Sequence, residues 1–163
     1  MSDPKFKFAL REDLVGSNIS FLPMCGTNMS TGWDVKAAFE GGKNLTLRAG
    51  EYVKIPLGFR VLCPDGWWME LRPRSSSFAK KYLHCLYGVI DCDYEGMCCL
   101  AAKYSPPHGF DSLEIKFGEA IGQIIPVKRK VMEVEEISNE DYDAACAARA
   151  GTRGAGAFGS TGL

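Results

Sequence analysis

The sequence predicts an all-β fold, and three features carry that prediction. Short apolar stretches with the period-two alternation of a half-buried strand recur along the chain, beginning with residues 5–11. Turn signals, such as Pro-Asp-Gly at 64–66, separate these stretches at intervals of about eight to twelve residues. Only residues 139–149 carry the start and stop signals of a substantial helix. This combination is typical of an antiparallel sandwich, barrel or jelly roll.

Length, charge and cysteine content limit the class of protein. With 163 residues, 46% apolar content and a formal net charge of -1, the chain can bury one core, and we expect no nucleic-acid or membrane partner. Residues 1–10 hold no continuous apolar run, so we expect no signal peptide or spanning helix and a soluble intracellular protein, cytoplasmic or nuclear. Seven cysteines without a Cys-x-x-Cys pair, beside two histidines, predict reduced and mostly buried thiols.

The first third of the chain predicts strands separated by loops. Residues 5–11 alternate apolar and basic side chains, which indicates a strand with a basic solvated face. Residues 15–32 lack periodicity and predict a loop that leads to Asp34, which is either a turn acid or an acid near a metal-bound water. Residues 45–48 and 52–62 predict two strands joined by a turn.

A serine-rich segment, residues 74–77, follows a predicted strand at 67–71. It precedes one or two predicted helical turns over residues 78–81, with a serine as N-cap. Its arginine and hydroxyl groups suit an anion such as phosphate. Plain helix capping is the alternative interpretation of the same residues.

The segment Gly88–Gly96 is the one around which the rest of the chain is organised. Two β-branched residues run into a tight polar turn, so the segment predicts a hairpin with Asp91 and Asp93 on one face and Tyr94 on the other. A carboxylate on a rigid strand end can take a proton from a water, and a nearby ring can pack on a ligand. A hairpin with merely solvated acids is the alternative.

The last third holds one more strand, one helix and a glycine-rich end. Gln123 stands among apolar neighbours in a predicted strand at 118–127, so its amide must bond to backbone or to a ligand. After the helix at 139–149, the glycine content of residues 151–163 predicts a flexible tail. Its arginine, phenylalanine and hydroxyl groups would suit a flap over a nucleotide; a floppy terminus is the alternative.

Five segments in this order closely resemble the motifs of the trimeric deoxyuridine triphosphatase (dUTPase) family. They are Gly32–Asp34, Pro73–Ser76, Gly88–Gly96, Gly118–Gln123 and Arg153–Gly162. Members of this family hydrolyse dUTP to dUMP and pyrophosphate, which keeps uracil out of DNA and supplies dUMP for thymidylate synthesis.

The resemblance implies a distinct architecture as well as an activity. It implies a distorted jelly-roll (β-clip) domain over residues 1–150 with one short helix, and a flexible tail over residues 151–163 that covers phosphate and uracil. It also implies a homotrimer with active sites at subunit interfaces and a requirement for Mg²⁺.

The resemblance further implies a role for each site residue. Asp91 would be the general base and would touch the 3′-hydroxyl, Tyr94 would pack under the sugar and exclude a 2′-hydroxyl, and Asp34 would hold waters of a phosphate-bound Mg²⁺. Ser75 would belong to the catalytic set. The remaining contacts to dUTP would come from Arg74, Ser75, Ser76 and Gln123 for the phosphates, from Cys85, Gly88, Val89, Ile90 and Cys99 for uracil through the backbone, and from Arg153, Phe158, Gly159, Ser160 and Thr161 of the tail.

The sequence departs from the family pattern at a few positions. Ala120 stands where an arginine is usual, which puts a structural ion pair in doubt, and Ala157 narrows the freedom of the tail. A dCTP deaminase, or a bifunctional deaminase and dUTPase, shares the fold and is one alternative, although such enzymes generally carry a glutamate as deaminating base. A non-catalytic jelly-roll interaction protein is another, and it would be expected to lack Asp91, Ser75 or the tail.

Overall fold

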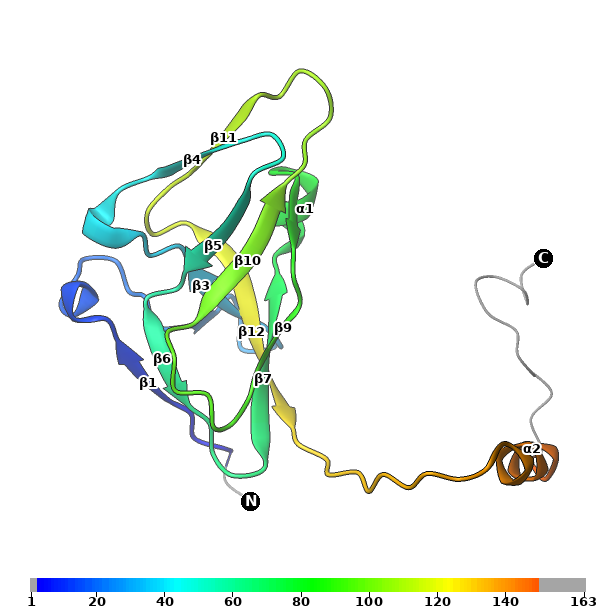
Figure 1. The fold of residues 1–163 in the computed structure, drawn as a ribbon. Helices are drawn as coiled ribbons and strands as arrows, with labels where there is room; N and C mark the ends of the chain where they lie inside the picture. The colour runs from blue at the N-terminus through cyan, green and yellow to red at the C-terminus, as the bar shows by residue number, and fades with distance from the viewer. Residues whose placement is uncertain (1–2, 150–163) are drawn as a thin grey trace. The chain divides into compact units, whose positions relative to one another are not determined.

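A computed structural model describes residues 3–149 of the chain. The chain divides into two compact parts, Met1–Lys130 and Val131–Leu163. The first part holds all the strands of the described region, and the second holds the helix α2 (Figure 1). The predicted domain boundary after residue 150 and the tail of residues 151–163 lie outside the described residues and stay predictions.

Strands dominate the first part, and the described region has two α-helices and two 3₁₀ turns. The strands are β1 (Lys7–Leu10), β2 (Met24–Cys25), β3 (Trp33–Lys36), β4 (Leu45–Arg48), β5 (Tyr52–Pro56), β6 (Phe59–Leu62), β7 (Trp67–Pro73), β8 (Leu83–Cys85), β9 (Gly88–Ile90), β10 (Cys99–Tyr104), β11 (Ser112–Ile115) and β12 (Ala120–Lys128). The helices are α1 (Ser75–Ala79) and α2 (Asn139–Ala147), and the 3₁₀ turns are η1 (Glu12–Leu14) and η2 (Glu40–Gly42).

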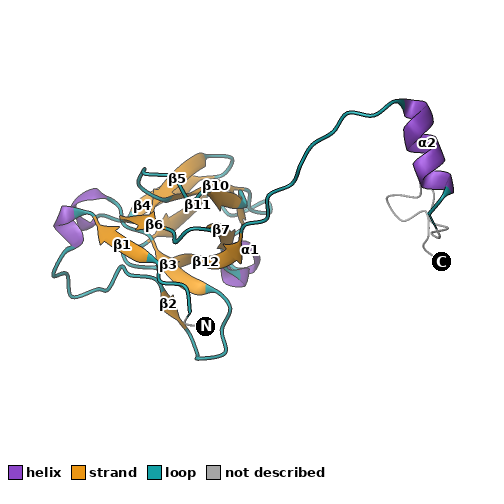
Figure 2. Cartoon of the chain, turned by 90° about the horizontal axis from the view of Figure 1, so that it is seen from below, coloured by secondary structure: helices purple, strands orange, loops and turns teal. Residues whose placement is uncertain are grey.

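The strands form four small antiparallel sheets rather than one continuous sheet (Figure 2). The largest has the order β2-β3-β12-β7-β9, and a second has the order β5-β10-β8. Two further ribbons are β1-β6 and β11-β4. Non-consecutive strands lie side by side in every sheet, so the all-β prediction is confirmed and the pairing is mostly long-range.

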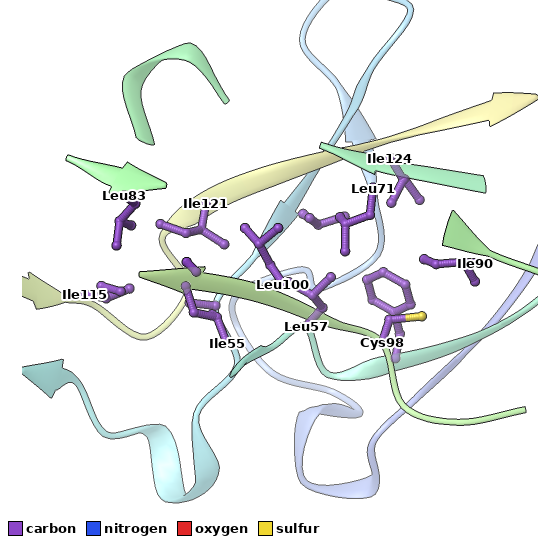
Figure 3. Packing of buried hydrophobic residues seen from close by; sticks show 14 of the residues in the cluster. Ile55, Leu57, Leu71, Leu83, Ile90, Cys98, Leu100, Ile115, Ile121 and Ile124 are labelled. Atoms are coloured by element: carbon purple, nitrogen blue, oxygen red, sulfur yellow. The ribbon is translucent and has the colours of Figure 1, made fainter. Parts of the chain in front are cut away.

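The core lies among these sheets and is mostly aliphatic, with the aromatic rings of Phe59 and Tyr104 also buried (Figure 3). Ile121 and Ile124 of β12 meet Leu100 of β10 and Leu57, each with 1% or less of its surface exposed. Burying side chains of this size contributes about 1.5–3 kcal/mol each relative to exposure. The core therefore fixes β12 and the strands beside it, which carry the candidate site.

The segment Gly88–Gly96 does not form the predicted hairpin. Instead β9 pairs with β7, with Ile90 opposite Met69, while β8 pairs with β10. A Cβ at position 88 would lie 3.3 Å from the Leu71 Cβ, so a glycine allows β9 to approach β7 closely here. β9, at the start of the segment, thus belongs to a different sheet from the flanking strands β8 and β10.

Other local predictions also need correction. The predicted loop at 15–32 contains β2, and the predicted strand at 52–62 is interrupted at Gly58. Gly58 has φ 76°, and a Cβ there would lie 2.3 Å from Leu14 Cδ1. Glycine is therefore the residue that fits at this break between the two strands. The N-cap of α1 is Arg74 rather than a serine, and no side chain caps that helix.

The predicted helix over 139–149 is confirmed in its type and start. α2 ends at Ala147, and the Ser138 side chain accepts a hydrogen bond from the Asp141 amide at 3.0 Å. Serine is a favoured residue at this cap because its oxygen satisfies an amide that the helix leaves free.

The seven cysteines are free thiols, but the prediction that most are buried is wrong. Only Cys98 is buried, Cys99 is exposed, and the others are intermediate. Burial raises the pKa of the Cys85 thiol to about 11 and that of Cys98 to about 12. A raised thiol pKa means that the reactive thiolate is scarce at neutral pH.

Candidate active site

A cation, a carboxylate and an amide from three segments meet at one end of β7. Arg74 follows β7, and its Nε lies 3.2 Å from Oδ1 of Asp34 on β3. Gln123 on β12 lies opposite Asp34 in the β3 register and opposite Arg72 in the β7 register. Such a set suits a phosphate group, because the guanidinium and the amide N–H groups can donate to phosphate oxygens. We call Asp34, Arg74 and Gln123 the phosphate cluster.

Gln123 is held from both sides. Its Nε2 donates a hydrogen bond to the Pro73 carbonyl oxygen at 3.1 Å, so of the two predicted kinds of partner, backbone and ligand, the amide has the backbone partner in this structure. On the other side, a Cβ at position 32 would lie only 2.0 Å from Gln123 Oε1. Gly32 therefore leaves the space that the Gln123 amide occupies, and this contact joins the first predicted motif to the fourth.

The serines beside Arg74 differ in exposure. Ser75 is exposed and Ser76 is half-buried, so both predicted phosphate contacts can reach a ligand. Ser77, by contrast, has 1% of its surface exposed, and its Oγ donates to the Ile121 carbonyl oxygen at 2.7 Å. Local sequence does not distinguish Ser77 from its neighbours, because its hydrogen-bond partner lies 44 residues further along the chain.

A second group of polar residues lies where β9 ends. Asp91 and Asp93 line a pocket of about 530 Å³ together with Arg129 and Trp68. The two acids thus face the same space, as predicted. Sequence reasoning missed Arg129, the cation at this pocket, because only the folded sheet brings the residue that follows β12 to the same pocket as the end of β9, with β7 between the two strands.

Tyr94 has its own fixed position next to this pocket. Its amide donates to the Asp91 carbonyl oxygen at 3.1 Å, and its hydroxyl donates to the Met97 carbonyl oxygen at 3.1 Å. A Cβ at position 96 would lie 2.3 Å from the tyrosine oxygen, so Gly96 leaves room for the ring. The ring remains 45% exposed and is available to a ligand.

The two groups stand at opposite ends of β7. Because Ile90 is opposite Met69, the next residue, Asp91, lies beside Trp68. Arg74 is six residues further along the same extended chain, which corresponds to about 20 Å at roughly 3.3 Å per residue. Within one chain, Asp91 and the phosphate cluster cannot act on the same phosphorus atom.

The predicted uracil-binding residues are divided between two sheets. Cys85 and Cys99 belong to the β5-β10-β8 sheet, whereas Gly88, Val89 and Ile90 form β9. Apolar side chains are exposed here: Leu86 and Tyr87, between β8 and β9, and Val89 of β9 each expose more than 60% of their surface. The Arg72 guanidinium lies 5.7 Å from the centre of the Tyr87 ring, a cation–π contact that sequence reasoning did not anticipate.

Part of the predicted site lies outside the described residues. These are the tail residues Arg153, Phe158, Gly159, Ser160 and Thr161. Within residues 3–149, no group of three histidine, cysteine or acidic side chains could hold a metal ion. No helix in the same region is long and apolar enough to span a membrane.

A family model described as dUTPase matches residues 20–162. The chain belongs to the dUTPase family. Among its relatives, a deoxyuridine 5′-triphosphate nucleotidohydrolase of Rhizobium rhizogenes is 35% identical over 87% of this chain and 85% of its own length. The enzyme of the same name from Wolbachia pipientis wMel is 32% identical over 99% of both chains.

Solved structures of phage dUTPases share the fold. The dUTPase of Staphylococcus bacteriophage 80alpha with dUPNHPP superposes with a TM-score of 0.78 at 20% identity, over 98% of this chain and 99% of that one. A mutant dUTPase from phage phi11 of S. aureus, described with a structural Mg(II) ion, gives a TM-score of 0.69 at 18% identity over 83% and 97%. The predicted dUTPase fold, mostly β with open sheets and a short helix, is thereby confirmed.

Proposed function

We propose that this dUTPase-family chain hydrolyses dUTP to dUMP and pyrophosphate in active sites shared between the subunits of a homotrimer. Family membership and the named relatives support the reaction. The single observation that supports the shared sites is the distance of about 20 Å along β7 between Asp91 and Arg74. A general base must lie within about 3 Å of the attacking water, so the base and the phosphate cluster come from different chains.

Asp91 takes the proton of the attacking water in this scheme. Hydrolysis of a phosphoanhydride needs alignment, charge neutralisation and one base rather than a covalent nucleophile. From another chain, Arg74 and Gln123 donate hydrogen bonds to the phosphate oxygens, and the exposed Ser75 and its neighbour Ser76 add hydroxyl contacts. Removing negative charge from the phosphates in this way makes pyrophosphate a better leaving group.

Asp34 suits a Mg²⁺ ion held through water. Its side chain is 33% exposed, and its Oδ1 is engaged by Arg74, so it can offer a water-mediated contact but no cage of ligands. Mg²⁺ commonly keeps several waters and binds through substrate phosphates with only one or two carboxylates, which fits this donor set. When bound, the ion neutralises phosphate charge and fixes the conformation of the triphosphate.

The nucleoside is recognised near Asp91. The exposed ring of Tyr94 packs under the deoxyribose and leaves no room for a 2′-hydroxyl, while Asp91 also meets the 3′-hydroxyl. Backbone groups of Cys85, Gly88–Ile90 and Cys99 bind the uracil edge. The tail covers the bound nucleotide, with Phe158 on uracil, Arg153 on the γ-phosphate, and Gly159, Ser160 and Thr161 adding contacts.

Two inactive variants test the shared site. Asp91→Asn keeps the shape of the side chain but cannot accept a proton, so turnover should fall about a hundred- to ten-thousand-fold. Arg74→Ala removes the guanidinium from the phosphate cluster. After the two variants are unfolded together and refolded as an equal mixture, about a quarter of the sites would pair an intact Asp91 with an intact Arg74 from another chain.

Pyrophosphate release from dUTP with Mg²⁺ is the measurement, and ammonia release from dCTP is assayed beside it. Return of about a quarter of the wild-type rate supports sites between chains. If subunit exchange is proven and the mixture is still as inactive as either variant alone, then Asp91 and Arg74 of one site come from the same chain. Ammonia without pyrophosphate would instead identify a dCTP deaminase.

A further inference from the structure

Two side chains outside the predicted motifs, Ser77 and Lys81, fasten α1 and the residues after it to the segment of the fourth motif that precedes Gln123. The Ser77 hydroxyl donates to the Ile121 carbonyl oxygen at 2.7 Å, and Lys81 Nζ lies 2.6 Å from Glu119 Oε1. The two acceptors, Ile121 in β12 and Glu119 directly before it, both precede Gln123 by only a few residues. We call Ser77, Lys81 and Glu119 the latch.

The ion pair of the latch is well fixed. The side chains of Lys81 and Glu119 are only 22% and 25% exposed, so water and salt screen the pair less than an ordinary surface pair. The second carboxylate oxygen of Glu119 accepts a hydrogen bond from the Lys116 amide at 3.1 Å. Both oxygens are therefore engaged, and the carboxylate cannot swing away from Lys81 without leaving the turn at residue 116.

The serine of the latch meets an irregular point in the sheet. The register of β12 with β3 shifts between Ala120 and Gly122, so Ile121 has no residue opposite it on β3. The β7 ladder begins only at Gly122, opposite Pro73, which has no amide hydrogen. The Ser77 hydroxyl satisfies the carbonyl group of this bulge, which a buried carbonyl requires.

α1 needs such support from outside. A helix of five residues has too few internal hydrogen bonds to hold its own conformation. Immediately after Lys81 the chain passes through Tyr82, which has φ 52°, a conformation that is unfavourable for a non-glycine residue. The placement of Arg74–Ser76 beside Gln123 thus depends on contacts made by the other end of α1.

We propose that the latch is the positioning device of the phosphate cluster: Lys81, Glu119 and Ser77 hold α1 on β12 so that Arg74, Ser75 and Ser76 face the same phosphate as Gln123. This inference rests on the proposed hydrolysis of dUTP. The latch residues touch no substrate and act through α1. Small misplacements of aligned groups cost up to about a hundredfold in rate, so loosening the latch lowers turnover.

Charge-removing variants of the ion pair provide the test. Lys81→Met and Glu119→Gln each remove the ion pair. The side-chain oxygen of the glutamine can still accept the hydrogen bond from the Lys116 backbone N–H. Each should lower kcat for dUTP about tenfold while KM changes by less than about threefold. The double variant should be no worse than the worse single variant, because both break one interaction. Lys81→Arg should retain kcat within about twofold.

The control and a second readout separate positioning from stability. Asp13→Asn breaks the Arg11–Asp13 pair, which includes no residue of the latch or of the phosphate cluster, and should leave kcat unchanged. Hydrogen exchange is measured at the amides of Lys80 and Tyr82, which donate to Ser76 and Phe78 in α1 and its continuation. We expect exchange about tenfold faster in Lys81→Met, at a temperature at which every variant is folded.

An unchanged kcat in Lys81→Met, additive losses in the double variant or unchanged exchange at Lys80 and Tyr82 would overturn the proposal. Wild-type protein that releases no pyrophosphate from dUTP would instead contradict the proposed function. The exchange measurement needs no substrate, so it still decides in that case whether the latch holds α1.

Ser77→Ala offers an independent variant because it leaves the ion pair intact. It should lower kcat in the same direction and speed exchange at the same two amides. A stable Ser77→Ala protein with wild-type kcat would remove the serine from the latch.

Discussion

Replacing Gly32 with alanine is a direct test of how Gln123 is held. The new Cβ would lie 2.0 Å from Gln123 Oε1 and 2.9 Å from its Cδ. These atoms are at the far end of a flexible side chain, and Gly32, directly before β3, has no positive φ, so alanine is not strained at its backbone. The glutamine should therefore swing away and lose its hydrogen bond to the Pro73 carbonyl oxygen.

The expected loss of stability in Gly32→Ala is small. The hydrogen bond from Gln123 contributes about 1 kcal/mol, while an alanine in place of glycine returns about 0.4–1 kcal/mol by restricting the unfolded chain. The net loss of about 0–0.6 kcal/mol corresponds to a fall in Tm of no more than about 2–3 °C for a chain of this size.

The expected loss of activity in Gly32→Ala is larger than the loss of stability. A hydrogen bond to a charged phosphate oxygen contributes about 1.5–3 kcal/mol, so kcat/KM for dUTP should fall about ten- to a hundredfold. Gly26→Ala is the matched control, because the nearest atom to a Cβ there is Ser30 Oγ at 3.7 Å. It should change neither quantity measurably.

A double variant completes the test of Gly32. If alanine at 32 acts only by displacing Gln123, then adding Gly32→Ala to Gln123→Ala should cost almost nothing more. Wild-type kcat/KM in Gly32→Ala would refute the reasoning, as would independent losses in the double variant. Thermal unfolding and pyrophosphate release, measured on the same preparations, supply both numbers.

Two further predictions concern the other half of the site. Tyr94→Ala should raise kcat/KM for UTP relative to dUTP by about tenfold, because it opens space beside C2′; an unchanged ratio would mean that ribose is rejected elsewhere. At pH 7.5, the exposed Cys99 should react with iodoacetamide much faster than Cys85 and Cys98. Burial raises the pKa of those two thiols to about 11 and about 12, which leaves less than about one part in a thousand as thiolate. Peptide mass spectrometry measures the three rates, and rapid labelling of Cys98 would contradict the prediction.

Local patterns in the sequence predicted the elements that local chemistry determines. The sequence predicted β1 from its alternation, β12 from its long apolar run and the start of α2 from its serine cap. Strand period and helix capping depend on neighbouring residues, so such features can be predicted locally. The two-residue β2 and the strand β11 were not predicted. Both exist as strands because β3 and β4 pair with them, and this pairing across the fold is not visible in the local sequence.

Candidate site residues could be named from the sequence, but their arrangement in space could not. Resemblance to the dUTPase motifs named Asp34, Arg74 and Gln123, and the structure brings these three together. The latch could not be found in the same way, because Ser77 and Lys81 find their partners more than 35 residues further along the chain. A local pattern predicts which residues are polar, whereas pairing across the fold decides what they contact.

Because the hairpin prediction was wrong, the sequence did not predict the pairing of β9 with β7. A hairpin at Gly88–Gly96 would leave the position of Asp91 relative to Arg74 undetermined. The observed pairing of β9 with β7 sets that separation through the register of a sheet, in which a slip of one residue would turn every side chain to the opposite face. Met69 and Leu71 of β7 are buried in the core and would leave it if the register slipped. The register therefore cannot shift to bring Asp91 and Arg74 together. The separation is therefore a rigid property of one chain, and it is the reason for our proposal that the active site is shared between chains.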